Sequence, residues 1–328
     1  MATAVFATAE LAARFFCGPY QRLWAYWTPE AGANLEAFRQ HVQNGGRLDL
    51  LVVGDSTAQS NFSYEVFRNG LQGPSEVWNI GTPGAFAEAS RWTLLPLLGA
   101  CECRPRVLVT SFLPEAFSEA PAVRYLEARI LESPAGRMAR GKSHLGKYLA
   151  LARLWPVLRV WKAEREGKVA AVIQQRGFLA RQRVVDLLRE PPESGAYYPL
   201  VLERLRLLDR LAAWAQANHV QLIVVIPPRL HPSAHARQYE EAYRRYLEQL
   251  SRSFPLVLLD TTGYSWPVEQ FADRNHLNAE GAARLSSLLV RRLAQTPRWS
   301  IDGPNPQVSR GISDRSSPFD HARRGTAQ

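Results

Sequence analysis

The chain has 328 residues, of which 46% are hydrophobic and 21% are charged, close to the average of globular proteins. A chain of this length and composition can bury a sizeable core, as one large domain or two small ones, so wholesale disorder is excluded. The formal net charge is +10, and the longest aliphatic runs, 50–53 and 222–226, fall far short of the roughly 18 residues that cross a bilayer.

The N-terminal stretch 1–16 is apolar, but it has no basic leading segment and is interrupted by Glu10 and Arg14. These are not the features of a signal peptide. We expect residues 1–46 to form an N-terminal helical segment, which is either an ordinary first helix or the stub of a truncated membrane anchor.

Short β-branched and aliphatic runs alternate with segments of helical period along 47–297. This alternation is typical of a parallel sheet wrapped by helices, and nearly all-apolar runs are typical of strands covered on both faces. We therefore predict an α/β domain over 47–297, a three-layer α/β/α fold around a flavodoxin-like sheet of about five parallel strands. The predicted strands are 48–53, 75–80, 105–110, 220–226 and 255–260, and the predicted helices are 59–70, 86–99, 200–218, 234–252 and 279–295.

The third and fourth predicted strands are about 110 residues apart, far more than a crossover needs. We predict a helical insertion over about 115–198, either a subdomain or a cap on the sheet. It contains a basic block, because between Arg137 and Arg189 thirteen Lys and Arg stand against three acidic residues. Such a block is either a solvated helical face or a surface for an anionic membrane or polymer. No nucleic-acid-binding motif accompanies it, so nucleic acid is not an expected partner.

The first predicted strand is followed by Gly54-Asp55-Ser56-Thr57. Catalytic groups of open parallel sheets gather at the carboxyl ends of the strands. Ser56 stands at the turn from strand to helix, where the helix dipole and free amides favour developing negative charge. Two interpretations stay open: Ser56 carries a reactive hydroxyl, or Ser56 or Thr57 is the N-cap of the next helix.

The last predicted helix is preceded by Phe271-Ala-Asp273-Arg-Asn-His276-Leu-Asn278. An Asp and a His three residues apart at a turn can meet, so that the carboxylate binds one imidazole nitrogen and the other faces a nucleophile. The alternative is an Asp or Asn helix cap beside an incidental, exposed His. In a five-strand sheet this segment and the Ser56 turn lie at the same edge, which predicts that Ser56 is near His276.

Three blocks of the sequence resemble one known family. Gly-Asp-Ser after the first strand, Asn79-Ile-Gly-Thr-Pro-Gly84 after the second and Asp273-x-x-His276-Leu-Asn before the last helix are similar to the first, second and fifth signature blocks of the SGNH (GDSL-type) hydrolases. The resemblance covers about 48–110 and 200–295. It implies a serine hydrolase or acyltransferase that works through an acyl-enzyme.

In the roles that this resemblance implies, Ser56 is the nucleophile, His276 the general base and Asp273 the carboxylate that orients the base. The backbone amides of Ser56 and Gly84 would form the oxyanion hole. A residue without a Cβ suits that position, because its amide can approach a reacting carbonyl closely.

One block departs from the family. After the third strand the family's enzymes carry Gly-x-Asn-Asp, whose Asn is a third oxyanion donor, whereas this chain has Thr110-Ser-Phe-Leu-Pro-Glu115. Loss of one such donor costs about 3–4 kcal/mol in other acyl-transfer enzymes. Ser111 is the candidate substitute, and Asn79 and Ser111 are the predicted substrate-binding residues.

The chain is also similar to the SGNH-like proteins that partner membrane-bound O-acyltransferases, among them the alginate O-acetylation proteins and the D-alanine transfer protein of teichoic acids. The features that carry this similarity include the missing Asn block, the large insertion and Val225-Ile-Pro-Pro228. This similarity implies a cell-envelope location, an acylated sugar or other ester as substrate, acetylation or deacetylation of a cell-surface polysaccharide, and a membrane-bound O-acyltransferase as partner. Two alternatives stay open. The missing Asn favours a non-catalytic scaffold that binds a polysaccharide or partner, and the N-terminus favours a stand-alone cytoplasmic lipase or thioesterase.

No cofactor or metal is expected. The three cysteines, Cys17, Cys101 and Cys103, have neither the number of a disulfide framework nor the spacing of a zinc site. His231 and His235 are four residues apart, but no carboxylate or Cys completes a ligand set, so we predict a turn and a helix start there. From 298 to 328, Gly, Pro, Ser, Asn, Asp and Arg predict a disordered tail.

Overall fold

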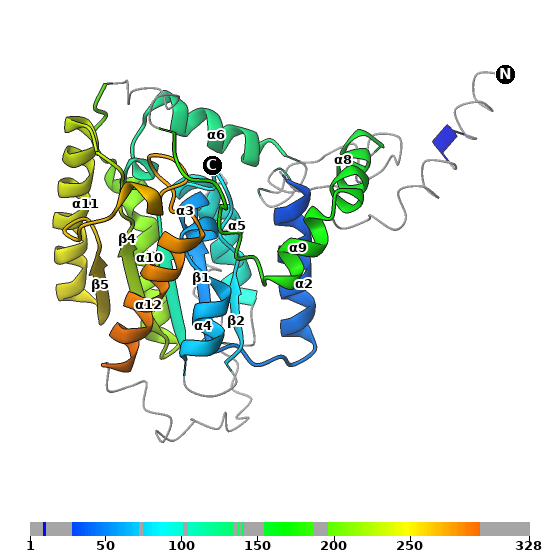
Figure 1. The fold of residues 1–328 in the computed structure, drawn as a ribbon, viewed down its shortest axis with the longest axis horizontal. Helices are drawn as coiled ribbons and strands as arrows, with labels where there is room; N and C mark the ends of the chain where they lie inside the picture. Colours follow the sequence, from blue (N-terminus) through cyan, green and yellow to red (C-terminus); the bar gives the residue numbers. More distant parts are fainter. Residues whose placement is uncertain are drawn as a thin grey trace, which may run out of the picture. The chain divides into compact units, whose positions relative to one another are not determined.

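Five parallel strands form one sheet in the order β2-β1-β3-β4-β5 (Figure 1). This is the flavodoxin-like order, and it confirms the predicted fold class. The register places the last residue of β1, Gly54, beside Ser111 at the end of β3. The strands are β1 (Leu50–Gly54), β2 (Val77–Asn79), β3 (Val107–Ser111), β4 (Gln221–Ile226) and β5 (Leu256–Asp260).

The computed structural model describes residues 9–10, 28–71, 75–100, 104–133, 137, 140, 154–186 and 196–295. Most of the expected anchor stub, the three cysteines and the expected tail at 298–328 lie outside these residues. Met1–Arg292 form one unit, which holds the sheet and the site described below, and Leu293–Gln328 form a second.

Helices lie on both faces of the sheet (Figure 1). In and around the sheet they are α2 (Pro29–Gln43), α3 (Ser56–Ser60), α4 (Tyr64–Gly70), α5 (Ala87–Ala100), α10 (Leu202–Ala217), α11 (Ala234–Ser253) and α12 (Ala279–Ala294). The segment between β3 and α10 adds the 3-10 turn η2 (Pro114–Phe117) and helices α6 (Pro121–Leu131), α8 (Leu154–Arg165) and α9 (Lys168–Gln174). A second 3-10 turn, η5 (Val268–Gln270), precedes α12.

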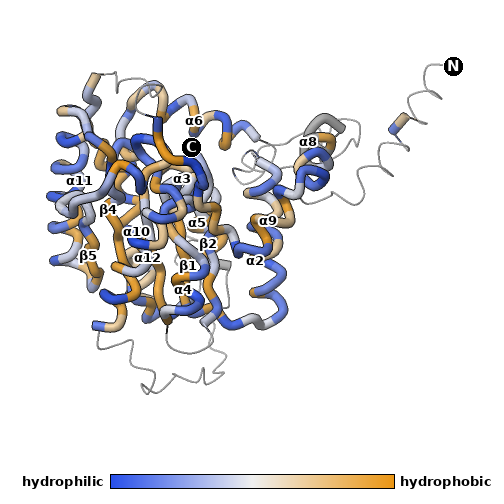
Figure 2. Tube along the Cα trace, viewed as in Figure 1, coloured by the Kyte–Doolittle hydropathy of each residue, from blue (hydrophilic) through white to orange (hydrophobic). Residues whose placement is uncertain are grey.

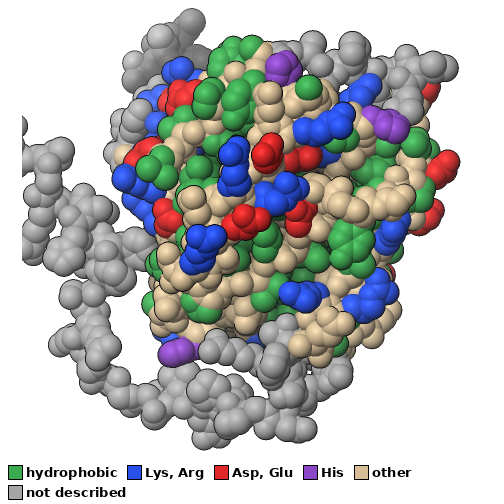
Figure 3. Space-filling view, turned by 90° about the vertical axis from the view of Figure 1, so that its left-hand side faces the viewer, with side chains coloured by type: hydrophobic (Ala, Val, Ile, Leu, Met, Phe, Trp, Pro, Cys, Tyr) green, Lys and Arg blue, Asp and Glu red, His purple; other side chains and the backbone are tan. Residues whose placement is uncertain are grey.

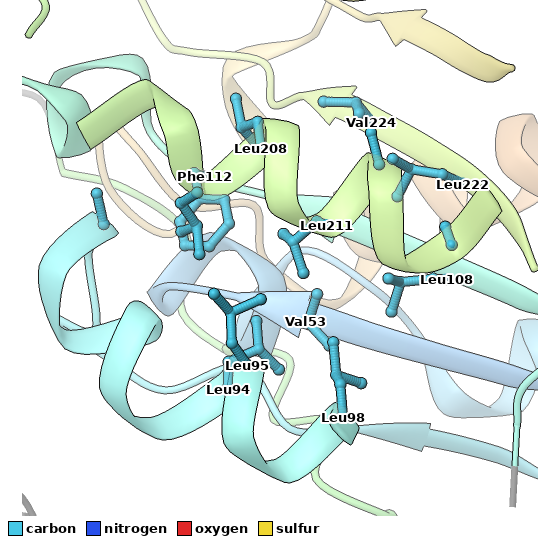
Figure 4. Close-up of a cluster of buried hydrophobic side chains, with 14 of the residues drawn as sticks. Val53, Leu94, Leu95, Leu98, Leu108, Phe112, Leu208, Leu211, Leu222 and Val224 are labelled. Atoms are coloured by element: carbon cyan, nitrogen blue, oxygen red, sulfur yellow. The ribbon is translucent and has the colours of Figure 1, made fainter. Parts of the chain in front are cut away.

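One face of the sheet packs against α5 and α10, and its apolar side chains form the main core (Figure 4). Val53 and Leu108 from the strands meet Leu95 of α5 and Leu211 of α10, and all four are almost completely buried. The opposite face carries α3, α4 and α12 (Figure 1). Burial on both faces explains why the strands are nearly all apolar, which Figure 2 shows as hydrophobic colour along the sheet.

The surface over α11, at the β5 edge of the sheet, mixes charges of both signs (Figure 3). Arg237, Glu241, Arg245 and Glu248 all belong to this helix. The face shown in Figure 3 is therefore not a basic patch, although the chain as a whole has a net charge of +10.

The prediction of one helix over 59–70 is wrong, because two helices cover this part of the chain. α3 ends at Ser60 and α4 begins at Tyr64, with Ser63 as its N-cap. Between them, the Oδ1 atom of Asn61 accepts a hydrogen bond from the backbone N–H of Leu277, at 2.9 Å. A tertiary contact therefore ends the first helix one turn after it begins.

Candidate active site

The turn between β1 and α3 presents Ser56. Gly54 has a φ of +144°, and a Cβ built there would lie 1.8 Å from the carbonyl oxygen of Ser111, so this position requires glycine. The N-cap of α3 is Asp55, whose Oδ1 accepts from the N–H of Thr57 at 2.8 Å. The interpretation of Ser56 or Thr57 as the cap is therefore wrong, and the Ser56 hydroxyl is not used in capping.

Ser56, His276 and Asp273 form one hydrogen-bonded chain. The Oγ atom of Ser56 lies 2.8 Å from Nε2 of His276. The Nδ1 atom of the same ring lies 2.7 Å from Oδ1 and 3.0 Å from Oδ2 of Asp273. The structure thus brings together the three residues that the sequence placed at two distant segments.

The loop that carries Asp273 and His276 is a tight hairpin before α12. Asp273 Oδ1 accepts from the backbone N–H of Asn275 at 2.9 Å and of His276 at 3.0 Å. The N-cap role falls to Asn278, whose Oδ1 accepts from the N–H groups of Glu280 and Gly281, at 3.1 Å each. Asp273 is therefore not a helix cap, and the His276 side chain is only 12% exposed.

The Asp273 carboxylate is held in its charged form. Burial works to raise its pKa, but the hydrogen bond and charge of His276, the Asn275 N–H and the Arg181 guanidinium together lower the pKa to about 2. A carboxylate that stays ionised can hold a proton on Nδ1 of the imidazole, which leaves Nε2 to accept one from Ser56.

Asp55 joins the nucleophile turn to the end of β3. Its Oδ2 accepts from the N–H of Leu113 at 2.9 Å, and its Oδ1 also accepts from the Thr57 hydroxyl at 2.8 Å. The side chain is fully buried, and this burial raises the pKa of Asp55. The buried Asp55 therefore supports the turn that carries Ser56, without a hydrogen bond to His276, which is the partner of the Ser56 hydroxyl.

Ser111 and Asn79, the predicted substrate-binding residues, are both fully buried, which does not fit contact with a substrate. The Ser111 hydroxyl lies 3.0 Å from that of Thr57. The Asn79 side chain donates to the carbonyl of Ala58 at 2.6 Å and accepts from the N–H of Gly81 at 2.8 Å. Both side chains fix the backbone around α3, so we reassign them from substrate binding to support of the site.

Gly84, the predicted oxyanion residue, lies in the loop after β2. It has a φ of +73°, a conformation that favours glycine, whereas a Cβ there would meet its nearest neighbour, Leu126, only at 3.5 Å. Backbone conformation therefore favours glycine here, whatever the space around it. The roles of the Gly84 and Ser56 amides as oxyanion donors stay predictions.

Two arginines of the insertion reach the site, and nothing in their sequence context separates them from the rest of the basic block. Nη1 of Arg181 donates to Oδ2 of Asp273, and Nη2 of Arg183 lies 3.8 Å from the same oxygen. They precede Asp273 by about 90 residues, so only the folded chain shows the contact.

The described residues contain no group of three or more His, Cys, Asp or Glu placed to hold a metal ion. His231 lies in a bend with a φ of +47°, and His235 is in the first turn of α11, as the predicted turn and helix start require. Within the same described ranges, no helix is both long enough and apolar enough to cross a membrane.

Comparison with other proteins gives little. No family model and no curated protein matches the chain. Among solved structures, it is similar to a crystal structure from Bacteroides fragilis NCTC 9343 described as a "putative acylhydrolase", with 11% identity over 79% of this chain and 95% of that one. The TM-score of this comparison is 0.37.

Proposed function

We propose that the protein is a serine hydrolase or acyltransferase of SGNH type that cleaves esters through an acyl-enzyme. The observation that carries the proposal is the hydrogen-bonded chain from Ser56 through His276 to Asp273. A hydroxyl, an imidazole and an ionised carboxylate in this order are the parts of a nucleophile activated by an oriented base.

In the proposed reaction, Ser56 Oγ attacks the carbonyl carbon of the ester while Nε2 of His276 takes the hydroxyl proton. The tetrahedral intermediate expels the alcohol, which leaves with that proton, and an acyl-Ser56 ester remains. Water or another hydroxyl then attacks the acyl group, with His276 again taking the proton and returning it to Ser56. Asp273 holds the imidazole by Nδ1 and stabilises its transient positive charge.

The oxyanion of the intermediate needs donors, and we assign this role to the backbone amides of Ser56 and Gly84. Phe112-Leu-Pro-Glu115 follow β3, without the Asn of the family, and the backbone N–H of Leu113 is already bonded to Asp55. An enzyme with one donor fewer is expected to turn over slowly, because the loss raises the activation barrier by about 3–4 kcal/mol. Slow hydrolysis would suit a protein that passes its acyl group to one specific acceptor.

The finer assignment is transfer of an acyl group to or from hydroxyls of a cell-surface polysaccharide, with a membrane-bound O-acyltransferase as partner. Its support is the sequence similarity to SGNH-like partners of such transferases, together with the missing Asn. The exposed Lys162 and Arg165 of α8 and Lys168 of α9 supply positive charge for an anionic polymer or membrane.

A non-catalytic scaffold is the second candidate function, and one observation favours it. Ser111 at the end of β3 and Phe112 and Leu113 after it are all buried, so none of the three offers a side chain to the oxyanion. A chain that retains the triad geometry without this donor can bind an acylated ligand and turn it over too slowly to matter.

A serine-directed fluorophosphonate probe distinguishes the two candidates. The parent chain should be labelled at one position, identified as Ser56 by peptide mass, and Ser56→Ala should not be labelled. The matched control is Ser287→Ala, whose hydroxyl in α12 donates to the carbonyl of Ala283 at 2.8 Å, and it should label like the parent. Absence of labelling in the folded parent would overturn the enzyme assignment and leave the scaffold.

A further inference from the structure

A short segment of the insertion is hydrogen-bonded to the two elements that carry the proposed triad, helix α3 with Ser56 and the loop with Asp273 and His276. We call residues 179–185 the bridging segment. At its start, the N–H of Leu179 donates to the carbonyl of Gln59 in α3 at 3.0 Å. At its end, the N–H of Val185 donates to the carbonyl of Phe271 at 2.8 Å. The segment therefore spans from the helix of the nucleophile to the loop of the base.

Arg181 lies in the middle of this segment and is fixed by its backbone. It forms a parallel bridge with Asn278, and its carbonyl accepts from the N–H of Ala279 at 2.7 Å. These bonds place its side chain beside the hairpin that carries Asp273 and His276.

The Arg181 guanidinium shares a carboxylate with the imidazole. Its Nη1 donates to Oδ2 of Asp273, and the same Oδ2 lies 3.0 Å from Nδ1 of His276. The Asp273 side chain is 15% exposed and that of Arg181 is 36% exposed, so solvent screens this contact only in part. Whenever His276 is protonated, two cations, the imidazolium and the Arg181 guanidinium, therefore share the negative charge of Asp273.

We propose that Arg181 is a positioning residue: by neutralising part of the Asp273 charge, it limits how strongly that carboxylate stabilises positive charge on His276. This inference rests on the proposed function. A cation beside a shared carboxylate weakens the attraction between that carboxylate and an imidazolium.

Besides Arg181, three charged groups of the described residues act on the ring or on its carboxylate. Asp273 is on its own loop, Arg183 lies 3.8 Å from Asp273 Oδ2, and the buried Asp55 interacts with His276 electrostatically from the turn before α3. Arg274 adjoins Asp273 in the sequence, and its carbonyl accepts from the N–H of Leu230. Of the two arginines that reach the carboxylate, Arg181 makes the hydrogen bond.

The test is an NMR titration of the His276 ring, whose resonance His276→Gln identifies among the seven histidines. In Arg181→Gln the titration midpoint should rise by about half a pH unit to one unit, since an unshared carboxylate stabilises the imidazolium. Arg181→Lys keeps the charge and should stay close to the parent. Arg165→Gln, an exposed arginine of the same insertion that stacks on Trp161, is the matched control and should not change the midpoint.

A second variant covers the case in which Arg181→Gln does not fold. Arg183→Gln removes a side chain that is 62% exposed, and it should move the midpoint in the same direction by a smaller amount. Unchanged midpoints in the folded variants would overturn the proposal. So would loss of Ser56 labelling at every pH without a shift, which is the result of a purely structural role.

Labelling kinetics separate this inference from the proposed function. If Ser56 is reactive, the acid limb of its labelling rate should move upward in Arg181→Gln together with the ring titration. If the parent is not labelled at all, the proposed function fails, yet the NMR midpoint still decides whether Arg181 controls the protonation of His276.

Discussion

The side chain of Asn61 accepts a hydrogen bond from the backbone N–H of Leu277, at 2.9 Å across 216 positions of sequence. Asn61 directly follows α3, and Leu277 directly follows His276. Asn61 is fully buried, so water does not compete for this bond. The helix of the nucleophile and the loop of the base are thus joined by a direct bond close to the reacting atoms, and their separation does not depend on the sheet alone.

The first prediction concerns Ser56→Ala. The variant should lose fluorophosphonate labelling and acyl transfer, while its thermal midpoint stays near that of the parent, because Asp55 caps α3 and the Ser56 hydroxyl does not. Thermal unfolding and labelling are measured on the same preparation. A loss of about 1 kcal/mol in stability with activity intact would mean that Ser56 serves the helix after all.

The second prediction concerns Asp55→Ala. This change removes the cap from Thr57 and leaves the buried N–H of Leu113 without its acceptor. We expect a loss of about 2–4 kcal/mol in the free energy of unfolding, measured by urea denaturation.

Its control is Ser233→Ala, which removes the half-buried N-cap of α11, where the hydroxyl accepts from the N–H of Ala236 at 3.1 Å. That variant should lose only about 1 kcal/mol. Equal losses in the two variants would show that Asp55 acts as a cap alone, without the added strength of its bond to Leu113.

A buried charged cluster at the carboxyl edge of the sheet supports the third prediction. Arg229, after β4, is paired with Glu115 of η2, and Glu240 of α11 is buried nearby. Among the residues that the structure describes, Oε1 of Glu240 has no hydrogen-bond partner. Burial raises the pKa of Glu240 from 4.5 to about 7, with Arg229 opposing this shift and Glu115 adding to it.

Because the folded chain holds this proton to higher pH than the unfolded chain, stability should fall as the pH rises from about 4.5 to about 7 and then level off. Glu240→Gln cannot ionise. At pH 5 it should match the parent, and at pH 8 it should be more stable by on the order of 2 kcal/mol. Thermal melts at both pH values check this, and an equal difference at both would rule out the raised pKa of Glu240 as the cause.

The fourth prediction concerns the basic insertion. Replacement of Arg153, Arg159, Lys162 and Arg165 by Gln should weaken binding to anionic liposomes or polysaccharide, and salt should weaken binding of the parent in the same way. Each basic residue that touches an anionic bilayer contributes about 1 kcal/mol. Ser56 labelling should be unaffected.

In the described part of this block, an acidic side chain already pairs with two of the basic side chains. Glu166, between α8 and α9, lies 3.8 Å from Lys162 and 2.6 Å from Lys168, so part of the positive charge is neutralised locally. Sedimentation with vesicles at low and high salt measures the remainder. Equal binding by the variant and the parent at low salt would identify the block as a solvated face.

Strand positions were predictable from the sequence because each strand is a short apolar run, and a parallel sheet was predictable because helical segments alternate with these runs. The break between α3 and α4 was not, because the apolar spacing continues through the fully buried Phe62 and the break depends on the distant N–H of Leu277. Ser56, Asp273 and His276 were placed together by strand-end logic. That logic locates an edge of the sheet but not the direction of each side chain, so Asn79 and Ser111 were assigned to the wrong surroundings.

The two anchoring bonds of the bridging segment limit how this protein can be redesigned. A shortened chain made by joining β3 directly to α10 would retain every strand and every residue of the proposed triad. It would nevertheless lose the donors from Leu179 and Val185 that reach Gln59 and Phe271. The same deletion would remove Arg181 from the Asp273 carboxylate. The bridging segment therefore holds the two elements of the proposed triad together, and its removal should abolish Ser56 labelling in a protein whose sheet still folds.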